Sequence, residues 1–309
     1  MKRSVLITGG LGFIGRNLDR LLEEDYDVRI IDNLSSCGEC ADAGKGLDGR
    51  VIVGDLLDVE ACRRATKGVD IVVHLAARGS VVDSVIDPVD NFNNNVRGTF
   101  NILRAAGENG VKKVVFSSTG GALMGNCKLP VTEESIPAPI SPYGASKLAG
   151  EGYCRAFANV YGMSVTILRF ANVYGPYSAH KKGLINAVIG SMLSGSPIKI
   201  YGDGSASRDF LYVEDICRGI VSAMRLEHDQ TEVFHIASGL ESTILQVVDL
   251  LRGIGGREDH PVEFCLPRAA EVGNNYASYE KAHAILGFTP EVALRDGLEA
   301  TWEWLLLNR

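Results

Sequence analysis

The segment TGGLGFIG at residues 8–15 restricts the fold more than any other part of the chain. It follows a short β-branched stretch, SVLIT, and leads into a stretch with helical spacing. Gly9, Gly12 and Gly15 allow a tight turn, close approach of a pyrophosphate to the backbone, and close packing of a helix on a strand. Asp32 ends the next apolar stretch, where a carboxylate can accept hydrogen bonds from an adenosine ribose. This order of strand, turn, helix and acid predicts a dinucleotide-binding unit.

The acidic residue also indicates which dinucleotide is bound. The carboxylate of Asp32 would repel the 2′-phosphate of NADP, and no arginine stands directly beside it in the sequence. Asp55 and Leu56 end the third apolar stretch and suit the adenine edge. We therefore expect NAD as the cofactor. The alternative interpretation is a glycine-rich turn with an aspartate that caps it.

Short apolar stretches alternate with helical patterns along much of the chain. Continuous apolar stretches indicate strands that are buried on both faces of a sheet, and their alternation with helices indicates parallel pairing through right-handed crossovers. The expected fold class is α/β, a Rossmann-type doubly wound parallel sheet with a smaller interleaved substrate-binding lobe. The expected strands are 4–8, 28–32, 51–55, 70–76, 113–118, 164–169 and 233–237, and the expected helices lie near 14–24, 58–66, 95–109 and 144–160.

The alternation weakens beyond residue 170, where loops rich in glycine and proline become frequent. This change predicts two interleaved parts. Residues 1–169 are expected to form the NAD-binding Rossmann domain, with residues 213–236 returning to it. Residues 170–212 and 237–309 are expected to form the smaller lobe.

Net charge and cysteine content narrow the class of protein. A formal charge of −7 argues against nucleic acid or an anionic membrane as the main partner. The apolar run behind Met1 is too short for a signal peptide, and no stretch approaches the roughly 18 apolar residues of a membrane span. We expect a cytoplasmic protein with reduced thiols, because the seven cysteines are scattered and odd in number. Cys37 and Cys40 form a lone CxxC, which we interpret as two loop thiols and not as a metal site.

The segment SPYGASKLAGE at residues 141–151 places a tyrosine four residues before a lysine. Pro142 predicts that a helix begins near Tyr143, and the apolar spacing beyond it is that of an amphipathic helix. Tyr143 and Lys147 then lie one turn apart on the same face. An ammonium beside a phenol favours the phenolate and lowers its pKa, which would make Tyr143 a general base. The alternative interpretation is a packed ring with a solvated charge.

Motifs along the whole chain resemble those of one enzyme family. The first set is TGGLGFIG (8–15), IIDNLSS (30–36), GDLLD (54–58), VVHLAA (72–77), NNVRGT (94–99), SST (117–119) and YGASK (143–147). This set resembles the extended short-chain dehydrogenase/reductase family. The later segments resemble its nucleotide-sugar epimerase branch, particularly UDP-glucose or UDP-N-acetylglucosamine 4-epimerases; they are RFANVYGP (169–176), YGDGSASRDFLYVEDI (201–216) and ILGFTPEVALRDGLEATWEWL (285–305).

The resemblance implies an NAD-dependent epimerisation at C4 of a UDP-hexose. Tyr143 would remove the C4 hydroxyl proton while a hydride passes from C4 to NAD⁺, and the transient 4-keto sugar would turn over before reduction on its other face. Lys147 would lower the tyrosine pKa and hold the nicotinamide ribose. Either Thr119 or Ser118 would hydrogen-bond the sugar O4.

The resemblance also implies binding residues for the cofactor and the substrate. The expected NAD contacts are Gly9, Gly12, Phe13, Ile14, Gly15, Asp32, Asn33, Asp55, Leu56, Leu75, Ala76, Ala77, Asn95, Tyr143 and Lys147. The expected contacts of the UDP-sugar are Thr119, Tyr143, Asn172, Arg208, Arg268 and Asn275. The two arginines suit the diphosphate, because a guanidinium presents a planar fork to two phosphate oxygens.

The basic segment SAHKKG (178–183), with His180, Lys181 and Lys182, either lines the mouth of the pyrophosphate site or forms a solvated loop.

Three positions depart from the family pattern. Met124 stands where relatives commonly carry a tyrosine, which affects the shape of the sugar pocket. Gly120 and Gly121 stand where 4,6-dehydratases place an Asp-Glu pair, so elimination of water lacks its acid and its base. Gly79 stands where some relatives carry a lysine, so one substrate contact is absent or is supplied elsewhere.

The sugar preference is expected to depend on Asn275. In this family the aligned position is bulky in enzymes restricted to UDP-glucose and UDP-galactose and small in those that accept N-acetylhexosamines. We therefore expect UDP-GlcNAc/UDP-GalNAc interconversion, with UDP-glucose and UDP-galactose as secondary substrates. The alternatives are a UDP-glucuronate 4-epimerase or decarboxylase, and a non-catalytic NAD-binding sensor, which would be expected to lose Tyr143 or Lys147.

The resemblance further implies a homodimer. Relatives usually pair through the helix that carries the Tyr-Lys motif and the helix before it, here 144–160 and 95–109. Leu148, Tyr153 and Phe157 either serve that contact or pack on the sheet.

Overall fold

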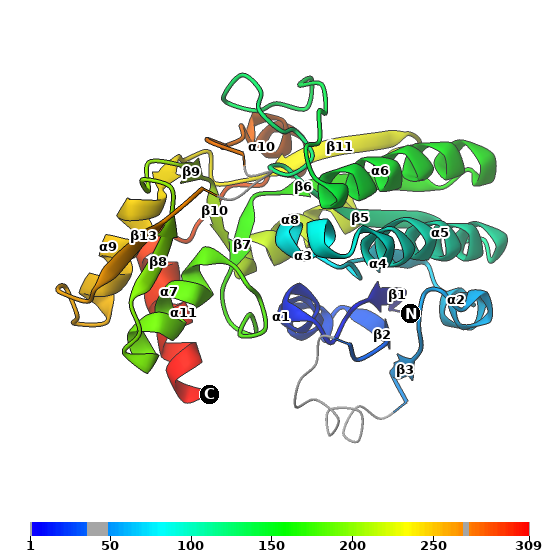
Figure 1. Cartoon of the computed structure of the whole chain (residues 1–309). Helices are drawn as coiled ribbons and strands as arrows, with labels where there is room; N and C mark the ends of the chain where they lie inside the picture. Colours follow the sequence, from blue (N-terminus) through cyan, green and yellow to red (C-terminus); the bar gives the residue numbers. More distant parts are fainter. Residues whose placement is uncertain (1, 36–48, 268–271, 309) are drawn as a thin grey trace.

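The computed structural model describes residues 2–35, 49–267 and 272–308. A seven-stranded parallel sheet forms its largest element, as predicted (Figure 1). Each predicted strand belongs to this sheet, because each is a continuous apolar run that helices cover on both faces. In spatial order the strands are β11 (Thr231–Ile236), β6 (Ser164–Phe170), β5 (Lys113–Thr119), β4 (Ile71–His74), β1 (Arg3–Thr8), β2 (Tyr26–Asp32) and β3 (Val51–Val53).

The order of the strands determines where a ligand can bind. The chain runs outward from β1 through β2 to β3, and then returns to the other side of β1 to form β4, β5 and β6. The carboxyl ends of β1 and β4 therefore feed loops that diverge from each other. In open α/β sheets, this switch point is the place where ligands bind.

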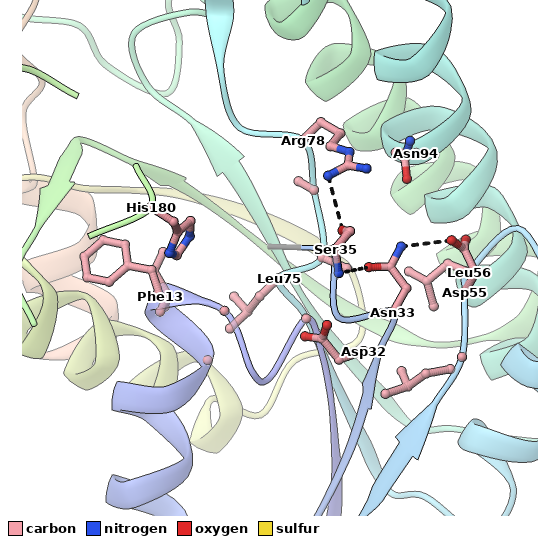
Figure 2. A pocket seen from close by; sticks show the side chains of 18 of the residues that line it. Phe13, Asp32, Asn33, Ser35, Asp55, Leu56, Leu75, Arg78, Asn94 and His180 are labelled. Atoms are coloured by element: carbon pink, nitrogen blue, oxygen red, sulfur yellow. Dashed lines mark hydrogen bonds between the residues drawn. The ribbon is translucent and has the colours of Figure 1, made fainter. Parts of the chain in front are cut away.

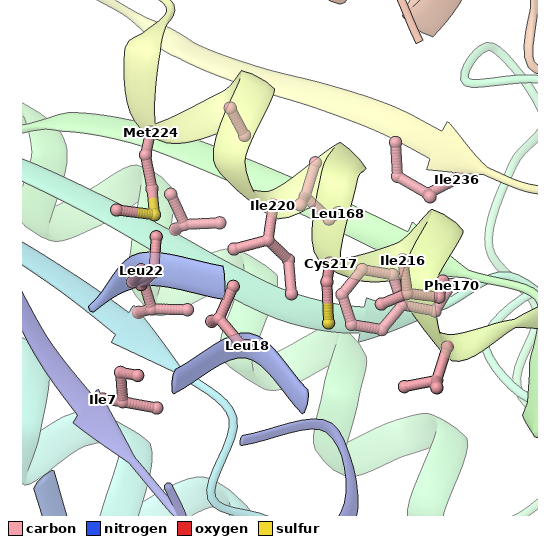
Figure 3. Close-up of a cluster of buried hydrophobic side chains, with 14 of the residues drawn as sticks. Ile7, Leu18, Leu22, Leu168, Phe170, Ile216, Cys217, Ile220, Met224 and Ile236 are labelled. Carbon is pink, nitrogen blue, oxygen red and sulfur yellow. The ribbon is translucent and has the colours of Figure 1, made fainter. Parts of the chain in front are cut away.

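Helices cover both faces of the sheet, which makes the fold doubly wound. On one face, α1 (Phe13–Leu22) and α8 (Val213–Arg225) pack together over the strands (Figure 3). Leu18 of α1 and Ile220 of α8 are fully buried in this layer. The opposite face carries α2 (Val59–Thr66), α5 (Gly98–Glu108) and α6 (Pro142–Tyr161).

A second apolar core lies beside the sheet (Figure 1). It is built from side chains such as Val188, Met192, Val247 and Leu298, all at most 1% exposed. The elements around it are α7 (Leu184–Ser194), β8 (Ile198–Tyr201), β10 (Phe210–Tyr212), α9 (Ile244–Ile254), β13 (Val262–Cys265) and α11 (Leu294–Leu307). The remaining elements are α3 (Val81–Ile86), α4 (Pro88–Phe92), a π-helical turn (Asn93–Arg97), β7 (Asn172–Tyr174), β9 (Ser207–Arg208), β12 (Ser242–Thr243) and α10 (Glu280–Leu286).

A buried carboxylate connects segments that lie far apart in the sequence. Asp209 is 1% exposed, and it accepts hydrogen bonds from the backbone N–H of Ser238 (2.9 Å), of Gly239 (3.2 Å) and of Ala277 (3.4 Å). The Ser238 hydroxyl donates a further bond of 2.7 Å. The end of β11 and the segment before α10 are therefore tied to the start of β10.

None of the helices in the described ranges combines the length and the apolar character that a bilayer span requires.

Helix α6 packs closely on β5 and on the loop after β5 at two glycine positions. A Cβ on Gly144 would lie 2.1 Å from the carbonyl oxygen of Ala122, and a Cβ on Gly150 would lie 2.6 Å from Cζ of Phe116. Contacts this short require the neighbour to move, and Phe116 is buried in the sheet at 1% exposure. The helix can therefore keep this position against the strand and the following loop only while these positions lack a side chain.

We expect Gly150→Ala to lower the free energy of unfolding by about 1–3 kcal/mol, the usual cost of overpacking a core. The matched control is Gly152→Ala in the same helix, where a Cβ meets nothing within 4 Å. The control is expected to gain up to about 1 kcal/mol from helix propensity. Urea unfolding of both variants measures the difference, and equal stability of the two would contradict this account of α6.

Candidate active site

The glycine-rich loop and the first turn of α1 form a cradle at the switch point. Gly9 has a φ of +67°, and a Cβ there would lie 2.8 Å from Cα of Ala76 in the loop after β4. A Cβ on Gly15 would lie 2.5 Å from Cα of Gly10. Gly12 caps α1, and no side chain bonds to the N–H groups of the first turn. Backbone donors and the positive end of the helix dipole are thus left for an anion.

The carboxylate of Asp32 lines the same cavity and lies beside the glycine-rich loop (Figure 2). It accepts hydrogen bonds from the backbone N–H of Leu11 (3.1 Å) and of Leu34 (2.8 Å), which fix it at the end of β2. The side chain of Asn33 donates to Asp55 at 2.9 Å, so the ends of β2 and β3 are joined.

One cavity brings together most of the predicted cofactor residues. Those that line it are Gly9, Gly12, Phe13, Ile14, Gly15, Asp32, Asn33, Asp55, Leu56, Leu75, Ala76 and Ala77. His180 and Lys181 also line it, and they come from the loop between β7 and α7. Arg78 and Asn94 are lining residues that the sequence analysis missed, although each directly follows or precedes a predicted contact.

Asn95 positions the loop after β4 and is not part of the cavity wall. Its Oδ1 accepts a hydrogen bond of 2.7 Å from the N–H of Arg78, and its Nδ2 donates to the carbonyl of Arg78 (3.1 Å). Nδ2 also donates to the hydroxyl of Ser146, next to Lys147 in α6 (3.1 Å). Asn95 belongs to the π-helical turn, a local distortion that is frequent at functional sites.

The Tyr-Lys pair lies in the first two turns of α6. Ser141 caps the helix by accepting a hydrogen bond of 3.2 Å from the N–H of Gly144. Lys147 is 4% exposed, its Nζ donates to the carbonyl of Ser117 at 2.8 Å, and it lies 5.1 Å from the ring centroid of Phe116. The ammonium is therefore anchored to the end of β5.

Burial decides the charge states of this pair. It raises the pKa of Tyr143 to about 12 and lowers the pKa of Lys147 to about 8. For Tyr143 this direction is opposite to the one expected, because burial disfavours the charged phenolate. The lowering of the phenol pKa by Lys147 stays a prediction. Tyr143 is a neutral phenol at neutral pH here, and its action as a base requires a further positive charge at the site.

Ser118 is committed to a buried ion pair. Its hydroxyl donates to Glu151 at 2.6 Å, and Arg169 holds the same carboxylate with two bonds of 2.9 and 2.8 Å. Both charged side chains are 4% exposed. Thr119 is the next residue of β5, where successive side chains alternate between faces, and no bond of its hydroxyl is found among the described residues. Of the two hydroxyls left open by the sequence, that of Thr119 is the one available to a ligand.

Two further predicted substrate residues, Asn172 and Arg208, lie in the short strands β7 and β9 and do not line this cavity. Asn172 begins β7 and donates from Nδ2 to the carbonyl of Asp209 (3.1 Å). Arg208 lies in β9 and donates from Nη1 to the carbonyls of Ser207 (2.7 Å) and Gly273 (2.8 Å). Arg268 lies outside the described residues, as do Cys37 and Cys40.

Comparison with known proteins identifies the family of the chain. The model of the NAD dependent epimerase/dehydratase family matches residues 5–237. The chain belongs to this family.

Solved structures of related enzymes have the same fold. The UDP-glucose 4-epimerase of Thermotoga maritima with UDP-glucose is 38% identical, with a TM-score of 0.91 over 99% of each chain. The UDP-N-acetylglucosamine 4-epimerase of Methanobrevibacter ruminantium, in complex with UDP-N-acetylmuramic acid, is 31% identical, with a TM-score of 0.91 over 100% of each chain. The UDP-glucuronic acid 4-epimerase of Bacillus cereus, in complex with UDP-glucuronic acid and NAD, is 29% identical, with a TM-score of 0.89 over 99% of this chain and 100% of the other.

The residues present fit the NAD of this epimerase/dehydratase family. The uncapped first turn of α1 and the absence of side chains at Gly9, Gly12 and Gly15 suit a pyrophosphate against the backbone. Asp32 at the end of β2 suits a ribose diol and disfavours a 2′-phosphate. The cofactor is therefore NAD, as predicted.

Sequence reasoning also missed the buried ion pair of Glu151 and Arg169, which lies behind the Tyr-Lys pair. Glu151 follows Lys147 by one helical turn, so it shares the face of α6 that meets the sheet. Arg169 is the last residue but one of the apolar strand β6. A carboxylate on a buried helix face and an arginine in a buried strand were the available signals, because such charges are retained inside a protein when they are paired.

We expect the low pKa of Lys147 to appear in the pH dependence of stability. An unfolded lysine stays protonated up to about pH 10.4, whereas the folded one loses its proton above about pH 8. Between these values the unfolded state binds more protons, so the free energy of unfolding rises with pH, by about 1 kcal/mol per unit for this group. Urea unfolding at pH 7.5, 8.5 and 9.5 of the natural chain and of Lys147→Met measures it. Parallel curves for the two chains would contradict the assignment.

Proposed function

We propose that this protein is an NAD-dependent UDP-sugar 4-epimerase that interconverts UDP-GlcNAc and UDP-GalNAc, with UDP-glucose and UDP-galactose as secondary substrates. The relatives with matching folds include 4-epimerases of UDP-glucose, UDP-N-acetylglucosamine and UDP-glucuronic acid. The observation that carries the choice among these sugars is an unpartnered amide of Asn275 beside Gly121.

Asn275 presents a buried hydrogen-bond donor without an acceptor. The residue is 4% exposed, and its Nδ2 has no partner among the described residues. Its Oδ1 lies 3.4 Å from the position that a Cβ on Gly121 would occupy. Gly121 is the second residue after Thr119, so the amide borders the end of β5. An unsatisfied buried donor is costly, and an acetamido carbonyl on the sugar is an acceptor that relieves this cost.

The chain's own groups have separate roles in the proposed reaction. Tyr143 exchanges a proton with the C4 oxygen, and Thr119 hydrogen-bonds that oxygen. Lys147, anchored on β5, holds the nicotinamide ribose and keeps a positive charge beside the phenol. When bound, NAD⁺ supplies the hydride acceptor and the additional positive charge that favours the phenolate. Asn172, Arg208 and Arg268 are proposed to hold the UDP.

Elimination of water, the dehydratase reaction of this family, is poorly served by the same site. The positions after Thr119 are Gly120 and Gly121, which supply neither an acid nor a base. A Cβ on Gly120 would lie 3.2 Å from Nδ1 of the buried His235, so a longer side chain there would have to displace the imidazole. Epimerisation, which needs only proton and hydride transfer at C4, is therefore favoured.

A homodimer is proposed through α5 and α6. Phe100, Tyr153, Phe157 and Tyr161 form a row of ring contacts with centroids 5.3 to 6.0 Å apart along these helices. Tyr153 is 37% exposed and Tyr161 is 36% exposed, so the row reaches the surface. Leu148 packs instead against Leu123 and Met124 in a small core beside the site.

Proton NMR of the anomeric signals tests the reaction. Purified protein is incubated separately with UDP-GlcNAc, UDP-glucose and UDP-glucuronate, and the 4-epimers are expected to form fastest from UDP-GlcNAc. Tyr143→Phe is the control, since it should retain NAD and lose turnover by a factor of at least about 100, the usual range for a general acid-base group. No epimer from any of the three sugars would contradict the proposal, and faster turnover of UDP-glucuronate would overturn the sugar assignment.

We expect Asn275→Leu, which keeps the volume and removes the donor, to lower kcat/KM for UDP-GlcNAc by about 5- to 10-fold, the value of one hydrogen bond. The kcat/KM for UDP-glucose is expected to stay within about 2-fold. Asn274→Ala, at the exposed neighbouring position, serves as the matched control. An equal loss of kcat/KM for both sugars would show that Asn275 supports the shape of the pocket and does not bind the acetamido group.

A further inference from the structure

The loop between β7 and α7, residues 175–183, contributes to the wall of the cofactor cavity and is held by contacts on both sides. On one side, Asn17 of α1 donates to the carbonyl of Pro176 (3.0 Å) and Arg20 of α1 donates to the hydroxyl of Tyr177 (3.3 Å). On the other side, Lys182 forms an ion pair of 3.0 Å with Asp83 of α3. These bonds fix the backbone on either side of His180 and Lys181, the two residues of the loop that line the cavity.

The ammonium of Lys181 occupies the space where residue 79 lacks a side chain. Nζ lies 3.3 Å from the position that a Cβ on Gly79 would take, and it is the single atom found within 4 Å of that position among the described residues. No carboxylate or other hydrogen-bond acceptor contacts this ammonium within the described ranges. The adjacent Lys182 differs, because its ammonium is paired with Asp83.

Acidic and basic side chains both line the cavity. The carboxylates are those of Asp32 and Asp55, and the basic groups are those of Arg78, His180 and Lys181. The charge of Lys181 also reaches the catalytic lysine: burial, and after it the positive charge of Lys181, lowers the pKa of Lys147. The cavity thus combines the ammonium of Lys181, for which the described residues supply no partner, with the uncapped backbone N–H groups of the first turn of α1. Such a combination binds phosphate oxygens.

We propose that the ammonium of Lys181 binds the diphosphate of NAD. It does so from the space beside Gly79, which has no side chain. The alternative source of the same anion is the diphosphate of the substrate. The cofactor is favoured because Lys181 shares a cavity wall with Gly12, Phe13 and Asp32, whereas Asn172 and Arg208 do not line that cavity. The inference holds whichever sugar is the substrate, since it concerns the NAD of the family.

Isothermal titration of the full chain, freed of nucleotide, with NAD and separately with UDP tests the proposal. Lys181→Met is expected to weaken NAD binding by at least about 10-fold, the range for a hydrogen bond to a charged group, and to change UDP binding by less than about 2-fold. Lys182→Met is the matched control and should leave NAD affinity within about 2-fold. The loss in Lys181→Met should shrink between 50 and 200 mM NaCl, since salt screens the ion pair. A loss for UDP that equals or exceeds the loss for NAD, or no loss for either, would overturn the proposal.

A second variant tests the placement in the gap. Gly79 is exposed and its φ is not in the left-handed region, so a side chain is tolerated there once the ammonium of Lys181 is removed. Adding Gly79→Lys to Lys181→Met brings an ammonium to the same space from the other side. We expect the double variant to recover most of the lost NAD affinity. An unchanged weak affinity in a folded double variant, as judged by its circular dichroism, would show that the ammonium does not act from this gap.

Discussion

The closeness of α6 to β5 is the constraint on which the rest of the site depends. Gly150 lacks a side chain against β5, and Gly144 lacks one against the loop after β5. The helix backbone therefore approaches the strand until Lys147 reaches the carbonyl of Ser117 and Glu151 reaches the hydroxyl of Ser118. These two contacts fix both the rotation and the depth of the helix. They leave Tyr143 at its N-terminal turn, beyond the end of the strand, where the switch point opens.

This closeness has an electrostatic consequence. A lysine and a glutamate lie on the buried face of one helix, and burial disfavours each charge unless it is matched. Glu151 is matched by Arg169, so the pair is satisfied within the fold. Within the described part of the chain, Lys147 contacts only a carbonyl and an aromatic ring, and its pKa falls to about 8. Lys147 is therefore poised to respond to charges that enter the cavity, whereas the ion pair behind it is not.

How far the sequence predicts this protein depends on the range of the interactions involved. The strands, the glycine turn and Asp32 follow from local patterns, because an apolar run or a glycine spacing is read within one element. Local patterns could not predict the hydrogen bond from Ser118 to Glu151, since it depends on which face of α6 meets β5. The high pKa of Tyr143 likewise arises from tertiary burial, and the sequence showed only the neighbouring lysine. Arg268 and the Cys37–Cys40 motif lie outside the described residues, so their predicted roles stay predictions.

Two connections link the wall of the cofactor cavity to neighbouring parts of the site. Asn95 joins the loop after β4 to Ser146 of α6, so the wall of the cofactor cavity and the catalytic helix cannot move independently. The loop 175–183 joins α1 to α3 over the same cavity. Gly79 lies where these two connections meet, and a larger residue there would displace the ammonium of Lys181. The absence of a side chain at position 79 is therefore better understood as room for a cation from another segment than as the loss of a contact.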